Sequence, residues 1–163
     1  MTDPLASQAF LQDRIDRLPL ATALLVAFEG SLVDDPAAVG AEPRIPDALP
    51  ALLAGLSKRV NGAVALFSRQ SAGTVQRLTS PVRFDVVGPG EGLRRWLAAQ
   101  RAEHRMPVIL TGWLDEADRQ AVADAGGTVV GVGDAGPPDV LRYPTPPQMR
   151  QGLVSLILQG LRR

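Results

Sequence analysis

The chain has 163 residues, of which 45% are hydrophobic, and this size and composition suit one domain with a sizeable apolar core. Its 17 Lys and Arg residues balance 17 Asp and Glu residues and are scattered along the chain, so we expect no basic surface for nucleic acid or an anionic membrane. With no cysteine and a single histidine, the chain excludes disulfides, thiolate metal sites and a multi-histidine metal site.

The N-terminal segment mixes acidic, polar and apolar residues and has neither a basic start nor an apolar centre. It therefore does not resemble a secretory signal, and no apolar run in the chain reaches the length that spans a membrane. From these features we expect a cytoplasmic protein.

Hydrophobic periodicity predicts helices that alternate with short buried strands. In chain order, the sequence predicts a helix over residues 5–18, a strand over 22–28, a loop over 34–46, a helix capped by Asp47 and ending near residue 60, a strand over 63–67, a helix over 71–78, a strand over 82–87, a helix over 91–103, a strand over 107–111, a helix over 115–125, a strand over 128–132 and a last helix over about 147–161. Five strands interleaved with helices indicate a three-layer, doubly wound α/β fold with a parallel, Rossmann-like sheet in a single domain spanning residues 1–163.

Ligands of such sheets bind beyond the carboxyl ends of the strands, which here are residues 27–31, 68–70, 111–116 and 131–136. Residues 131–136 match the pattern Gly-x-Gly-x-x-Gly, but Pro137 and Pro138 follow where a phosphate-binding helix would have to begin. The glycines of residues 88–92 are typical of a plain turn. His104 lies at a polar helix end, and the sequence contains no Gly-x-Ser-x-Gly elbow. Dinucleotide binding and hydrolysis by a serine nucleophile are therefore disfavoured.

Residues 25–32 read Leu-Val-Ala-Phe-Glu-Gly-Ser-Leu directly after the start of a buried strand. This segment resembles the motif Asp-x-Asp-Gly-Thr-Leu of the haloacid dehalogenase-like phosphatases. In that family the first aspartate is the nucleophile and a magnesium ligand, and the second is the general acid and base. The resemblance places Ala27 and Glu29 at these two positions, and a methyl group can neither attack phosphorus nor bind a cation.

Two further segments carry the resemblance. Ser68-Arg69 is similar to the Val-Ser-Gly-Arg motif, in which the serine hydroxyl holds the phosphoryl group. Residues 108–118 resemble the trehalose-phosphate phosphatase segment that ends in Gly-Asp-Asp-x-Thr-Asp-Glu. Gly112 and the pair Asp115-Glu116 align with its two ends, whereas Trp113 and Leu114 stand where the magnesium-binding aspartates belong.

The resemblance covers about residues 23–157, including the closing segments 125–133 and 141–146. The family's basic residue beside the phosphoryl group has no match, because the sole lysine is Lys58 and only Arg94, Arg95 or Arg101 remain as candidates. Only residues 88–106 occupy the interval where family members insert a cap domain, so we expect a capless domain.

The resemblance therefore implies a catalytically inactive phosphatase-like domain that acts as a binding, regulatory or protein-interaction module. We expect no intact catalytic residue, no metal site and no cofactor. The residues that the resemblance assigns to ligand binding are Gly30, Ser31, Ser68, Arg69, Gly112, Asp115 and Glu116.

Three alternatives stay open. The first is a residual magnesium-dependent sugar-phosphate phosphatase, in which Glu29 is the acid and base and Asp34, Asp35, Asp115 or Glu116 serve as metal ligands. The second is a sensor that holds a phosphorylated small molecule without turning it over. The third is a generic doubly wound domain in which these residues are ordinary turn and cap residues.

The last helix carries a wide apolar stripe, which consists of Met149, Leu153, Val154, Leu156, Ile157, Leu158 and Leu161. A stripe of this width exceeds what one packing face needs and leaves apolar surface for a protein partner or a second copy of the chain. A deeply buried terminal helix is the alternative explanation.

Overall fold

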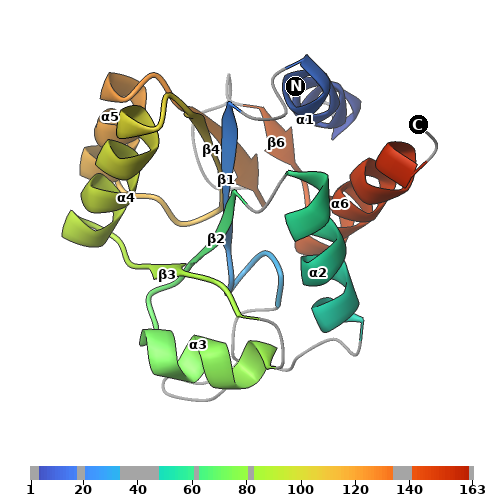
Figure 1. Ribbon diagram of the computed structural model, residues 1–163, viewed down its shortest axis with the longest axis horizontal. Coiled ribbons are helices and arrows are strands. Elements are labelled where there is room, and N and C mark those ends of the chain that lie inside the picture. The colour runs from blue at the N-terminus through green and yellow to red at the C-terminus, as the bar shows by residue number, and fades with distance from the viewer. Residues whose placement is uncertain are drawn as a thin grey trace.

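The computed structural model describes residues 4–17, 21–33, 48–60, 63–80, 83–133 and 141–161. These residues form one six-stranded sheet in the order β3-β2-β1-β4-β5-β6, and every neighbouring pair of strands is parallel. Helices lie on both sides of the sheet (Figure 1). The expected doubly wound α/β fold is confirmed, with six strands where the sequence predicted five.

The central strands are the longest and most deeply buried. The strands are β1 (Thr22–Ala27), β2 (Val64–Phe67), β3 (Val86–Val87), β4 (Met106–Thr111), β5 (Thr128–Val132) and β6 (Arg142–Tyr143). The chain builds β1, β2 and β3 outward in one direction and then returns to place β4 on the other side of β1. The strand order therefore reverses between β1 and β4, which is where ligands bind in open sheets of this kind.

Two helical layers enclose two separate apolar cores. The helices α1 (Pro4–Arg17), α2 (Leu49–Arg59) and α6 (Pro146–Leu161) cover one face of the sheet, and α4 (Glu91–Ala102) and α5 (Glu116–Asp124) cover the other (Figure 1). The remaining helix, α3 (Ala72–Thr79), packs beside β3 at the sheet edge. None of the described helices is long and apolar enough to cross a lipid bilayer.

The sequence missed β6 and overestimated β3. Two residues are too few to show a periodic pattern, and β6 exists because the Gly131 and Gly133 N–H groups donate to the carbonyls of Leu141 and Tyr143 at 2.7 and 2.9 Å. Residue 82 of the predicted strand 82–87 lies outside the described residues, and of residues 83–87 only Val86–Val87 form a strand, because this edge strand pairs only with Leu66 and Phe67 of β2.

The other predicted elements agree with the structure to within one or two residues at each described end. The predicted loop 34–46 and the predicted cap Asp47 lie outside the described residues. In the described part, Ala48 precedes the first turn of α2 and provides no side-chain cap.

Tyr143 on β6 connects the first and last helices to the sheet. Its hydroxyl donates to Oε1 of Gln8 at 2.7 Å, and Nε2 of Gln8 donates to the carbonyl of Gly152 at 3.0 Å. The Ser7 hydroxyl donates to the Arg142 carbonyl at 2.9 Å, so α1, β6 and α6 share one buried network. Burial raises the pKa of Tyr143 from 10.0 to about 12, because the tyrosinate would lose its hydration.

The raised pKa predicts a loss of stability in alkaline solution. The neutral phenol is favoured in the folded state, so its contribution is complete below pH 10 and is lost as the pH rises from 10 through about 12, by up to about 2–3 kcal/mol. Because Tyr143 is the sole tyrosine, the near-ultraviolet absorbance of tyrosinate measures its titration directly. A Tyr143→Phe variant is the control, since it should lack this absorbance change. A titration midpoint near pH 10 in the folded protein would contradict the prediction.

Candidate active site

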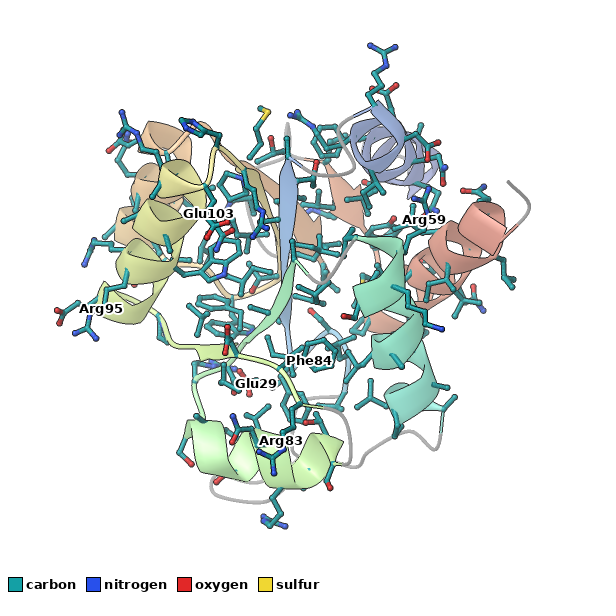
Figure 2. The ribbon with its side chains drawn as sticks, viewed as in Figure 1. Glu29, Arg59, Arg83, Phe84, Arg95 and Glu103 are labelled. Atoms are coloured by element: carbon teal, nitrogen blue, oxygen red, sulfur yellow. The ribbon has the colours of Figure 1, made fainter. Side chains whose placement is uncertain are left out.

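The carboxyl ends of β1, β2 and β4 bring together residues that are far apart in the sequence. Glu29 follows β1, Ser68 and Arg69 follow β2, and Trp113 follows β4. Figure 2 shows Glu29 at this edge of the sheet. The sequence analysis expected ligands to bind just beyond the strand ends. The segments that follow β1, β2 and β4 do lie together, at the point where the strand order reverses.

A tight turn after β1 positions Glu29. The N–H groups of Leu32 and Val33 donate back to the carbonyls of Ala27 and Phe28 at 3.3 and 2.9 Å. Gly30 adopts a φ of 75°, a conformation that costs little only for glycine. The Glu-Gly-Ser sequence therefore forms a tight turn, which brings Leu32 and Val33 back to the end of β1.

The far side of this turn is fixed by α6. Arg150 Nη1 donates to the carbonyls of Ser31 and Leu32 at 2.9 and 3.4 Å. Ser31 is fully buried, and its hydroxyl has no hydrogen-bond partner among the described residues. The guanidinium therefore holds the turn through its backbone rather than through the Ser31 side chain.

Glu29 is buried, at 2% exposure, and both of its carboxylate oxygens accept hydrogen bonds from the residues that follow β2. The Ser68 hydroxyl donates to Oε2 at 2.8 Å, and the Arg69 N–H donates to Oε1 at 2.9 Å. The Ser68 oxygen in turn accepts the Gln70 N–H at 3.0 Å. We call this arrangement of Glu29, Ser68, Arg69 and Gln70 the Glu29 bracket. It ties the end of β1 to the end of β2 through side chains where the sheet hydrogen bonds stop.

An aromatic stack lies next to the bracket. The ring of Trp113 is stacked on Phe67, with centroids 4.4 Å apart and planes within 9° of parallel. The guanidinium carbon of Arg69 lies 4.6 Å from the Trp113 ring. Trp113 Nε1 also donates to the Glu29 carbonyl at 3.0 Å, so the indole joins the ends of β4, β1 and β2.

Ala27, which the resemblance places at the nucleophile position, is completely buried. It pairs with Phe67 in the sheet register and shares its face of β1 with Leu25, which belongs to the apolar core under α4 and α5. Phe67 and Trp113 belong to or pack against that same core. The methyl group of Ala27 is therefore part of a hydrophobic layer.

The residues singled out in segment 108–118 have mainly structural roles. A Cβ atom at Gly112 would lie 2.2 Å from the Val132 carbonyl oxygen, so β4 and β5 approach too closely there for any other residue. Asp115 is the N-cap of α5, and its side chain accepts the Asp118 N–H at 2.8 Å. Glu116 is exposed in the first turn of α5. No hydrogen bond or ion pair of the described chain joins Asp115 or Glu116 to the Glu29 bracket.

Asp118 is a buried acid that the sequence analysis did not single out. Its carboxylate accepts the Gly90 N–H at 3.1 and 3.2 Å, and Gly90 caps α4 with a φ of 71°. The spacing Asp-x-x-Asp at positions 115 and 118 is typical of a helix N-terminus and could have indicated the cap. The long-range bond to Gly90 has no signal in the sequence.

Within the described ranges, no three or more His, Asp and Glu side chains form a group that could hold a metal ion. Asp34 and Asp35, considered as magnesium ligands, lie outside the described residues. No protein-family model matches the chain, and no curated protein sequence matches it. The likeness to trehalose-phosphate phosphatases is therefore carried by the residues alone and stays a hypothesis.

The bracket predicts a specific loss of stability. Replacing Ser68 by alanine removes the donor to Glu29 and leaves a buried carboxylate oxygen unsatisfied, so Ser68→Ala should lower the free energy of unfolding by about 1–3 kcal/mol. Urea unfolding followed by tryptophan fluorescence measures this change. The exposed Ser80 is the matched control, and Ser80→Ala should change stability by less than about 0.5 kcal/mol. Equal stability of the two variants would show that Ser68 does not hold Glu29.

Proposed function

We propose that this chain is a non-catalytic, phosphatase-like α/β domain that acts by binding another molecule. The observation that supports this proposal is the Glu29 bracket. A general acid must deliver a proton to a leaving group, which requires contact with the substrate. Glu29, at the acid and base position, is instead buried with both oxygens bonded to the end of β2.

The position of the nucleophile supports the same conclusion. Phosphoryl transfer through a covalent intermediate needs a carboxylate that faces the substrate. Ala27 supplies a buried methyl group in the apolar layer with Leu25 and Phe67. Neither a nucleophile nor a metal-binding oxygen is provided at this position.

The groups that would hold a phosphate bond to one another. The resemblance assigns the phosphoryl group to the Ser68 hydroxyl, yet this hydroxyl donates to Glu29 and accepts from Gln70. The Arg69 N–H is likewise bonded to Glu29. A phosphate would have to displace a buried carboxylate from all of these contacts, so we favour a binding role elsewhere on the domain over a phosphorylated-ligand sensor. A cytoplasmic location stays part of the proposal.

Phosphate release from a panel of sugar phosphates in the presence of magnesium tests the loss of catalysis. The natural protein and a Glu29→Gln variant should both release no more phosphate than a protein-free control. Magnesium-dependent release that Glu29→Gln abolishes would contradict the proposal and would show that Glu29 leaves the bracket to act as acid and base.

Restoring an aspartate at position 27 should not restore activity. Ala27→Asp would bury an unpaired carboxylate in the apolar layer, which should cost about 3–5 kcal/mol of stability and still give no phosphate release. Ala27→Ser is the control for a small polar side chain and should cost less in the same urea unfolding experiment. An Ala27→Asp protein that is both stable and active would show that the strand end is an open phosphatase site.

A further inference from the structure

A small cavity lies under α4 at the amino end of the sheet, and therefore at the opposite end of the strands from the Glu29 bracket. Its volume is about 90 Å³. A single water needs at least about 10–15 Å³, whereas a pocket for a drug-sized ligand has roughly 300–1,000 Å³. The cavity therefore suits a solute of a few non-hydrogen atoms.

The cavity is open because the sheet carries small side chains at this end. Successive side chains of a strand point to opposite faces, so Ala23 lies on the same face of β1 as Leu25. Ala63 and Ala65 likewise share the face of Phe67 on β2. The face carries Leu25 and Phe67 of the apolar core toward the carboxyl end, but only the three alanine methyl groups line the cavity at the amino end. These methyl groups leave space beneath α4.

The side of α4 above this space carries Trp96 and Gln100. The two residues are four positions apart, so they lie on the same side of the helix, and both line the cavity. Trp96 is half-buried and packs against the apolar core. Oε1 of Gln100 is shielded from solvent and has no hydrogen-bond partner among the described residues. An acceptor in this state is stabilised by any group that brings it a donor.

Two opposite charges complete the lining. Asp85 continues β3 backwards, since its carbonyl accepts the Leu66 N–H at 2.9 Å, and no hydrogen bond or ion pair of the described chain engages its carboxylate. The Arg105 guanidinium lies 3.5 Å from the carboxylate of Glu103, which leaves several of its five N–H donors available. Within the described ranges no ion pair joins Asp85 to Arg105, although both line one small cavity.

We propose that this cavity binds the zwitterion of a small α-amino acid, of which glycine is the simplest. The ammonium group donates to the Asp85 carboxylate and to Oε1 of Gln100, and the carboxylate accepts from the Arg105 guanidinium. A molecule that carries both charges matches the two unpaired charges better than an amine or a carboxylic acid alone. The volume excludes a large side chain. This inference gives a site and a ligand class to the binding role proposed above, and it rests on that role.

Isothermal titration calorimetry of the full chain with glycine is the first test. We expect saturable binding of glycine, and binding at least about fivefold weaker for methylamine and for acetate, because each of these keeps only one of the two charge contacts. Leucine should also bind more weakly than glycine, since its side chain exceeds the space beneath α4.

Charge-removing variants locate the binding site. Asp85→Asn and Arg105→Gln keep the approximate size of each side chain and should each weaken glycine binding at least about fivefold. The matched controls are Asp124→Asn on α5 and Arg94→Gln on the outer side of α4, which remove the same charges from exposed positions outside the cavity and should leave the affinity unchanged. Circular dichroism verifies that each variant is folded.

The proposal is overturned if the natural protein shows no saturable binding of glycine, or if methylamine or acetate binds as tightly as glycine. Equal affinities of Asp85→Asn and Asp124→Asn, or of Arg105→Gln and Arg94→Gln, would overturn it as well. The titration does not depend on phosphate release. A protein that releases phosphate contradicts the proposed function while its glycine titration still decides this inference, and an inert protein that binds no glycine contradicts this inference alone.

Discussion

A buried carboxylate must find hydrogen-bond donors within the fold, and at the carboxyl edge of this sheet Glu29 finds them in the residues that follow β2. The Ser68 hydroxyl and the Arg69 N–H occupy its two oxygens, while its backbone carbonyl accepts the Trp113 indole N–H. One residue thereby fixes the relative positions of the segments after β1, β2 and β4. The turn at Gly30 and the stack of Phe67 on Trp113 both lie next to this arrangement.

The same arrangement explains why the strand ends do not form a phosphatase site, the hypothesis that their sequence suggested. Ser68 and Glu29 satisfy each other, and the stack of Phe67 and Trp113 continues the apolar layer in which Ala27 lies. In a catalytic site such polar groups would contact the substrate. Here they bond to one another and hold the strand ends in place.

Much of the fold could be predicted because its strands are parallel and buried on both sides, which produces continuous apolar runs such as residues 22–28. The edge strands were predicted poorly because they are too short to produce such a run. β6 has only two residues, and β3 is limited by how far β2 extends beside it. At the site, the sequence correctly indicated that Glu29, Ser68 and Arg69 follow predicted strands, whereas it gave no prediction of the contacts of Trp113 and Asp118.

The sequence by itself determined the alternation of helices and strands, the absence of cysteine chemistry, and the identity of the residues after each strand, because these follow from local pattern and composition. Only the tertiary structure decided what those residues do. That Glu29 bonds to Ser68, that Asp118 bonds to Gly90 and that Gly112 lies against Val132 are facts of distance between segments far apart in the chain. Local periodicity carries no information about such distances, because they are fixed by how the strands pair and the helices pack.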